Sequence, residues 1–166
     1  MAEVFIEQLV KQKTPIFKIM LKYFILSLTV VFALGGFLLF PPFLCVALLL
    51  GLLFWWVNMQ NEVEFEYACL NGDMDIDRII GQQKRKGVIR MVTGKMEIVA
   101  PSDSPRIKEH KYAHAKVLNC SSNERSAKTY TIIYNGDDGR FEVIFEPDEE
   151  VLQALKNFSP SKVFIE

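Results

Sequence analysis

A stretch of about 35 residues without a charged side chain limits what this chain can fold into more than any other feature. It runs from Tyr23 to Val57 and reads YFILSLTVVFALGGFLLFPPFLCVALLLGLLFWWV. One unbroken helix of that length would measure roughly 50 Å, whereas the hydrocarbon core of a bilayer is about 30 Å thick. The stretch is therefore too long to be a single membrane-spanning helix.

Two residue pairs in the middle of the stretch supply a break. Gly35-Gly36 loosens the helix, and Pro41-Pro42 cannot donate the backbone hydrogen bonds that a continuing helix needs. We therefore predict a transmembrane hairpin over residues 17–60, with spans at about 17–39 and 42–59. A single span, a re-entrant loop and a core helix of a soluble protein are the alternatives, and the last is usually far shorter.

Cations and tryptophans mark the ends of the two predicted spans. Lys18 and Lys22 are expected to extend from the first span towards the headgroups, and Trp55 and Trp56 fit an interfacial aromatic belt. The amino-terminal flank is rich in lysine, whereas the turn between the spans carries no charge. Because positively charged flanks stay in the cytoplasm, we predict a multi-pass protein of the cell membrane with both termini cytoplasmic.

Residues 1–16 form an amphipathic amino-terminal segment. Phe5 and Leu9 are four residues apart, as are Ile6 and Val10. This spacing aligns apolar side chains along one side of a helix, so it predicts an amino-terminal helix. Three possibilities are open for this helix: it lies in the membrane interface, it docks on the domain that follows the hairpin, or it is a frayed terminal helix without a partner.

From residue 61 onward the apolar positions change to a period of two, which is typical of half-buried strands. In EVEFEYACL the aliphatic and aromatic residues face one side and the three glutamates the other. The pair Asn71-Gly72 predicts a tight hairpin turn, and further alternating segments follow. The segment PSDSPRIKEHK, residues 101–111, is expected to be an exposed connection.

The last third of the chain completes this domain. Two alternating strands surround a glycine-rich turn in TYTIIYNGDDGRFEVIFEP, and Pro147 ends the second of them. Asp148 is expected to cap a helix over residues 148–158. Residues 61–166 are thus predicted to be a cytoplasmic antiparallel β domain. The fold class is α+β, with an amino-terminal helix and a two-helix transmembrane hairpin followed by a small antiparallel β-sheet or barrel and a closing helix.

The chain resembles a family of small two-span membrane proteins of Gram-positive anaerobic bacteria that is known as a domain of unknown function. The segments that carry the resemblance are VFIEQLVKQK, both spans, EFEYACLNGDMDIDRIIGQQKRKGV, KMEIVAP and IFEPDEEVLQALKNFSPSKVFIE. That family has no assigned activity, so the resemblance implies no functional residues. In layout the chain is also similar to bacterial pleckstrin-homology-like (PH-like) membrane proteins, in which strands and a final helix follow a pair of membrane helices. This similarity implies a PH-like fold.

The segment QQKRKG, residues 82–87, is the main candidate site. Lys84, Arg85 and Lys86 are consecutive cations at an expected hairpin tip. Near a bilayer, each cation contributes on the order of 1 kcal/mol through attraction to anionic headgroups. We predict that these residues contact lipid or a protein partner, and the alternative is an ordinary solvated turn.

The acidic and histidine patterns do not predict a metal site. Asp73, Asp75 and Asp77 lack the glycine and the glutamate that complete a calcium-binding loop. His110 and His114 would share one face of a helix, but the glutamate of the zinc-protease motif is missing between them.

Other signatures of chemistry are also missing from the sequence. Cys45, Cys69 and Cys120 are far apart and in no CxxC pair, so we expect small buried thiols in a reducing compartment. A net charge of −1 gives no indication of a nucleic-acid partner. The sequence has no nucleophile or phosphate-loop motif, so we expect neither an enzyme nor a cofactor.

Three functions follow from these patterns. The favoured one is a membrane-tethered, non-enzymatic module whose β domain binds a protein partner or anionic lipid. The second is a structural or assembly subunit of a larger membrane complex, or a homo-oligomer, in which the Gly35-Gly36 region packs against another helix. The third is a metal-dependent membrane enzyme that uses Asp75 and Asp77.

Overall fold

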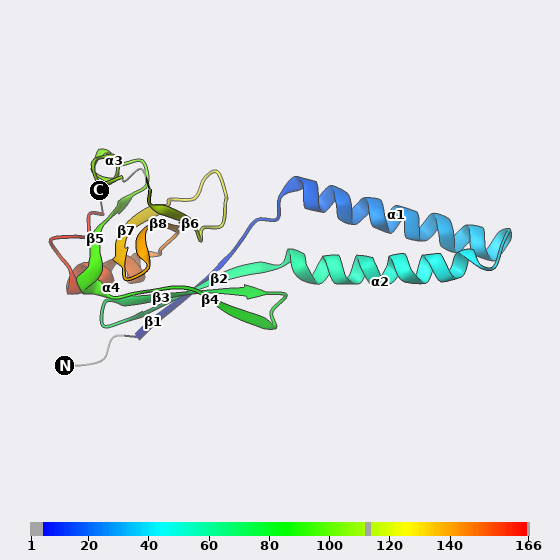
Figure 1. Ribbon diagram of the computed structural model, residues 1–166, viewed down its shortest axis with the longest axis horizontal. Coiled ribbons are helices and arrows are strands. Elements are labelled where there is room, and N and C mark those ends of the chain that lie inside the picture. Colours follow the sequence, from blue (N-terminus) through cyan, green and yellow to red (C-terminus); the bar gives the residue numbers. More distant parts are fainter. Residues whose placement is uncertain (1–4, 112–113, 166) are drawn as a thin grey trace. The chain divides into compact units, whose positions relative to one another are not determined.

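The computed structural model describes residues 5–111 and 114–165 and has the predicted α+β fold class (Figure 1). Two apolar helices are followed by strands, most of them antiparallel, and by a carboxy-terminal helix. The chain divides into two compact units. The first comprises the described residues within 1–12, 64–79 and 85–166, and the second comprises residues 13–63 and 80–84.

The second unit contains the helical hairpin. Helix α1 spans Ile16–Leu38 and helix α2 spans Phe43–Asn61, and the short turn that joins them contains the two prolines. A Cβ atom at Gly36 would lie 2.7 Å from the backbone nitrogen of Leu44, so only glycine permits this approach of the two helices. Gly36 thus packs against α2 of its own chain, and the packing of the Gly35-Gly36 region against a helix of another protein stays a prediction.

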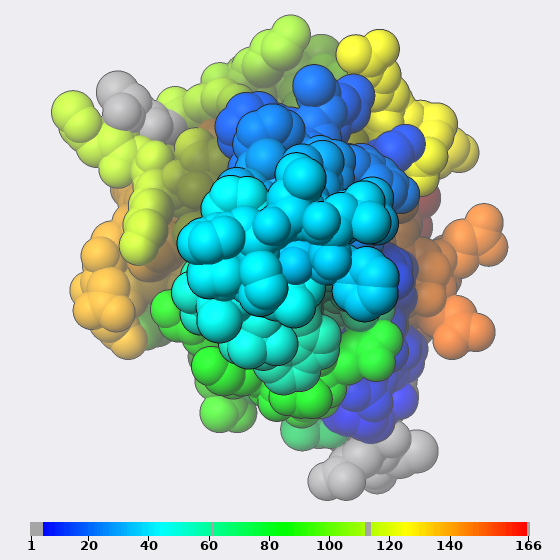
Figure 2. Space-filling model, turned by 90° about the vertical axis from the view of Figure 1, so that its right-hand side faces the viewer, coloured from blue at the N-terminus to red at the C-terminus, as the bar shows by residue number. Residues whose placement is uncertain are grey.

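Both helices are long and apolar enough to cross a membrane. Their 23 and 19 residues correspond to roughly 34 and 28 Å, close to the thickness of the hydrocarbon core. Each candidate span has a mean hydropathy of 1.9, and only 6% of the residues in its most apolar 18-residue window are buried. Bulky apolar side chains form the surface at the end of the hairpin that faces the viewer in Figure 2. The exposed apolar surface is typical of membrane helices and not of soluble core helices.

The first unit is built on two four-stranded sheets. One has the strand order β1-β2-β3-β4, and the other has the order β5-β7-β8-β6. Their bounds are β1 Phe5–Lys11, β2 Val63–Leu70, β3 Asp73–Ile80, β4 Lys84–Met91, β5 Met96–Pro101, β6 Lys116–Asn119, β7 Tyr130–Gly136 and β8 Gly139–Phe145. One pair departs from the antiparallel expectation, because β6 runs parallel to β8.

The predicted amino-terminal helix is wrong, because residues Phe5–Lys11 form strand β1. This strand pairs antiparallel with β2 in a register that runs from Phe5 opposite Leu70 to Lys11 opposite Glu64. In such a short segment the same apolar residues satisfy both helical and strand spacing, and the exposed edge of β2 selects the strand. Of the three possibilities, docking on the β domain is the one observed, although as a strand.

Side chains of both sheets meet in the core. The ring of Tyr67 on β2 lies 5.8 Å from that of Phe145 on β8, in an edge-to-face arrangement. The alternation predicted for β2 is confirmed, since Val63, Phe65, Tyr67 and Cys69 are all buried. The turn at Asn71-Gly72 is also confirmed, and both residues have a positive φ.

Three helical segments complete the first unit. Helix α4, Glu149–Phe158, begins at the predicted cap, where the Asp148 carboxylate accepts a hydrogen bond of 2.8 Å from the Val151 amide. The expected exposed connection contains the short helix α3, Pro105–His110, whose Ile107 side chain is fully buried. A single 3-10 turn, η1, spans Thr93–Lys95.

Candidate functional site

The three consecutive cations do not lie at a hairpin tip as predicted. The turn between β3 and β4 is formed by residues 81–83, and Lys84 already begins strand β4. Strand β4 is an edge strand of its sheet. Charged side chains are common on such strands because they discourage pairing with other chains. The basic segment therefore extends along a sheet edge, where successive side chains point to opposite faces.

Arg85 is bound by carboxylates of its own sheet. Its guanidinium donates a hydrogen bond to the Glu66 carboxylate and lies 3.9 Å from the Asp77 carboxylate. The Glu66 side chain is only 5% exposed, although its position in the alternating pattern faces away from the core. Arg85 thus has a structural role on the outer face of the sheet.

The outer face of this sheet also holds a pair of glutamates. The pKa of Glu66 is raised, first by a hydrogen bond with Glu7 on β1 and then by burial, while the nearby Arg85 guanidinium opposes the rise. A raised pKa favours a proton on this carboxyl group. Sequence alternation alone gave no sign of the pair, because Glu7 and Glu66 meet only when β1 pairs with β2.

Lys84 and Lys86 have different surroundings from Arg85. Both are exposed, and no carboxylate of the described residues forms an ion pair with either of them. Lys84 lines a pocket of about 290 Å³ that lies wholly within the second unit. The lining residues are Trp56, Met59, Gln60, Ile80, Gly81, Gln83 and Lys84. The structure therefore separates the three cations, and only Lys84 belongs to a pocket.

This pocket forms where the β3–β4 turn contacts the last turn of α2. The Gly81 amide donates a hydrogen bond of 2.8 Å to the Glu62 carbonyl. A Cβ atom at Gly81 would lie 2.7 Å from the Met59 carbonyl oxygen, and φ at this residue is +59°. Glycine is thus required twice, for the close approach and for the left-handed backbone.

The predicted membrane-interface residues lie at the same end of the hairpin. Lys18 is exposed in the first turn of α1, and the Lys22 ammonium lies 5.8 Å from the centre of the Phe54 ring on α2. Trp55 and Trp56 are 62% and 55% exposed. Apolar helix surface followed by cations and exposed indoles is the arrangement expected where a hairpin leaves a bilayer.

The acidic triplet on β3 is occupied by contacts within the domain. The Asp73 carboxylate accepts hydrogen bonds from the Thr93 amide and hydroxyl, at 2.8 and 2.9 Å. Asp75 lies 3.4 Å from Arg90, and Asp77 lies near Arg85. Among the described residues, no group of three or more histidine, cysteine, aspartate or glutamate side chains is placed to hold a metal ion.

Among the described residues, the histidines and cysteines do not form a metal-binding cluster either. Helix α3 ends at His110, so His110 and His114 do not share a helical face. Burial raises the pKa of the Cys69 thiol and raises that of Cys120 to about 11. The expectation of buried thiols is confirmed for these two residues and wrong for Cys45, which is exposed on α2.

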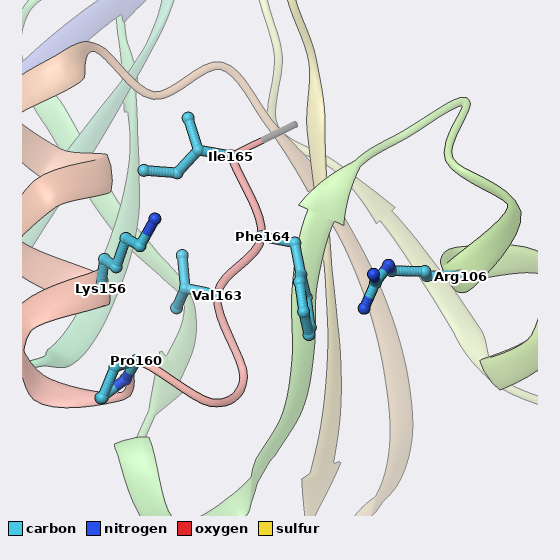
Figure 3. Close-up of a pocket in the computed structure, with 6 residues that line it drawn as sticks. All are labelled: Arg106, Lys156, Pro160, Val163, Phe164 and Ile165. Atoms are coloured by element: carbon cyan, nitrogen blue, oxygen red, sulfur yellow. The ribbon is translucent and has the colours of Figure 1, made fainter.

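A second pocket, of about 470 Å³, lies beside the carboxy-terminal tail (Figure 3). It is lined by Arg106, Lys156, Pro160, Val163, Phe164 and Ile165. The Arg106 guanidinium stacks on the Phe164 ring at 4.0 Å from its centre. The Phe164 amide in turn donates a hydrogen bond of 2.8 Å to the Val99 carbonyl on β5. These contacts fasten the tail to the edge of the second sheet, so the stacked Arg106 has a structural role.

Two four-stranded sheets with a closing helix, joined to a pair of apolar helices, define a PH-like domain of a membrane-associated module. The sequence model of the family described as Bacterial PH-like domain (DUF6106) matches residues 2–165, so the chain belongs to this family. No curated protein and no solved structure matches the chain. The family resemblance inferred from the sequence is confirmed, while the assignment to Gram-positive anaerobes stays a prediction. PH-like domains are generally non-enzymatic.

Proposed function

We propose that this protein is a multi-pass membrane protein whose PH-like domain acts as a non-enzymatic binding module at the cytoplasmic surface of the cell membrane. The ligand of the module is anionic lipid, and Lys84 and Lys86 are the contact residues. Arg85 is left out of the contact set because Glu66 and Asp77 already bind its guanidinium.

The pairing of β1 with β2 is the observation that carries the proposal. Only four residues separate β1 from α1, and one residue separates α2 from β2. The two strands pair along their full shared length. A single span would put these strands on opposite sides of a bilayer, where they cannot pair. Two complete spans put them on the same side.

The lysine distribution supports a cytoplasmic position for that side. Lys11 and Lys13 precede the hairpin, Lys18 and Lys22 lie in the first turns of α1, and the turn between the helices carries no charge. Short flanks that are rich in lysine or arginine stay in the cytoplasm. The cytoplasmic leaflet also carries the anionic lipids that attract exposed lysines.

The test is the reaction of single cysteines with a membrane-impermeant maleimide in intact bacterial cells that express the full chain. In a Cys45→Ser background, Phe40→Cys places a thiol in the turn between the helices, and Ser126→Cys places one in an exposed loop of the β domain. We expect the reagent to label Phe40→Cys in intact cells and Ser126→Cys only after the cells are permeabilised. The native Cys69 and Cys120 are buried and serve as the unlabelled background. Labelling of Ser126→Cys in intact cells would overturn the proposal.

A further inference from the structure

We infer that the pocket between the end of α2 and the β3–β4 turn binds the headgroup phosphate of one anionic phospholipid. This inference rests on the proposed function and makes it specific. It replaces a general attraction between lysines and the membrane surface with a single site, in which Gln60, Gln83 and Trp56 act together with Lys84.

The pocket is built by the fold. The hydrogen bond from the Gly81 amide to the Glu62 carbonyl holds the turn against the end of α2. The missing side chain at Gly81 lets the turn approach the Met59 carbonyl. Lys84 and Gln83 are thereby held beside Trp56 and Gln60, which lie on successive turns of α2.

The length of α2 sets the level of the pocket in the membrane. Its apolar part spans a length close to that of the hydrocarbon core, and the exposed Trp55 and Trp56 mark the boundary of that core. Gln60 lies one helical turn beyond Trp56, or roughly 6 Å along the axis. That distance places the polar part of the pocket among the lipid phosphates.

The lining of the pocket matches the two parts of a phospholipid. Trp56, Met59 and Ile80 give an apolar wall that suits the glycerol and the first methylene groups of a lipid chain. Lys84 offers an ammonium group to the phosphate, and the amides of Gln60 and Gln83 offer hydrogen-bond donors. The other described residues that line the pocket are uncharged, so the positive charge of Lys84 faces the headgroup without a carboxylate in the lining to balance it. This charge favours an anionic lipid over a zwitterionic one, whose own cationic group Lys84 would repel.

Fluorescence quenching in proteoliposomes tests the inference, because the chain has only two tryptophans. In a Trp55→Phe background, the emission reports Trp56 at the pocket. Lipids with brominated acyl chains quench tryptophans that they contact. Comparing brominated phosphatidylglycerol with brominated phosphatidylcholine therefore gives the relative affinity of the site for the anionic lipid.

We expect phosphatidylglycerol to be preferred, and Lys84→Gln to lower the preference about five-fold, as expected for one lysine near an anionic surface. Gln60→Leu should also lower it, although this change removes no charge. Lys84→Arg should retain the preference. The control Lys108→Gln, which removes an exposed lysine on α3 outside the pocket, should leave it unchanged.

The outcomes separate this inference from the proposed function. If brominated phosphatidylglycerol and brominated phosphatidylcholine quench Trp56 equally, the pocket assignment is overturned and the membrane placement is left intact. An equal loss of preference in Lys84→Gln and Lys108→Gln would also overturn it, because the attraction would then be diffuse surface charge. If neither brominated lipid quenches Trp56, the membrane placement itself is overturned.

Discussion

Replacing Tyr67 with phenylalanine removes one oxygen atom from the contact between the two sheets. Tyr67 is fully buried on β2. Its hydroxyl donates a hydrogen bond of 2.6 Å to the Cys120 carbonyl, at the end of β6, and accepts one of 3.2 Å from the Glu146 amide, just after β8. Tyr67 has no exposed surface, and this burial is the main cause of the raised pKa of its hydroxyl. Tyr67→Phe keeps the ring and leaves both backbone partners without a hydrogen bond.

The size of the effect follows from that geometry. Leaving a buried polar group without its hydrogen-bond partner lowers the free energy of unfolding by about 1–3 kcal/mol. We expect a value in this range because the core has no room for a water molecule that could replace the lost partner. For a domain of about 100 residues, each kcal/mol lowers the melting temperature by roughly 4–8 °C. We therefore expect Tyr67→Phe to lower the melting temperature of the β domain by about 5–15 °C.

Thermal unfolding of the full chain in detergent is followed with a dye that becomes fluorescent on reaction with thiols. Cys69 and Cys120 are each 1% exposed, and burial raises the pKa of both thiols, so they react only when the domain opens. Cys45 is exposed on α2 and is replaced by serine in every sample. Circular dichroism of the same samples reports the loss of the sheets independently.

Tyr134→Phe is the matched control. Tyr134 is 6% exposed, and its hydroxyl forms no hydrogen bond with the residues that the structure describes. We expect this variant to melt within 2 °C or so of the parent, because no buried partner is left behind. Equal melting temperatures for Tyr67→Phe and Tyr134→Phe would refute the argument that the Tyr67 hydroxyl holds the two sheets together.

Three further predictions concern other contacts. The pKa of Glu66 is higher in the folded chain than in the unfolded chain, so the folded chain binds this proton more tightly. The stability that protonated Glu66 contributes is therefore lost as the pH rises from 4.5 through the folded-state pKa. Over this pH range, the melting temperature should fall less in Glu66→Gln than in the parent. Gly81→Ala should destabilise the β3–β4 turn by about 1–2 kcal/mol and speed hydrogen exchange in residues 80–84, whereas Gly94→Ala, which has nothing within 4 Å, should not. Phe164→Ala removes the ring beneath Arg106 and should lower stability by about 2 kcal/mol and expose the tail to limited proteolysis; an unchanged cleavage pattern would contradict the role of this stack.

Local patterns predicted the parts of the fold that local physics decides. The charge-free stretch and its prolines identified the helical hairpin, since helix length and proline chemistry are properties of the chain alone. The predictions of the alternation in β2 and of the helix cap at Asp148 were correct for the same reason. The separation of Lys84 from Arg85 was not predictable, because it depends on the carboxylates that neighbouring strands bring to one face.

Strand β1 shows most clearly why the remaining features need the folded chain. Its seven residues contain too few turns to separate the two periodicities, and its partner lies beyond both membrane helices in the sequence. The Gln8 side chain then reaches further still, donating to the Glu146 carbonyl and accepting from the Asp148 amide at the start of α4. The edge strand, the hairpin and the closing helix are thus linked through one segment. Because β1 precedes the helical hairpin and β2 follows it, the first sheet is complete only when the two ends of the hairpin lie close together.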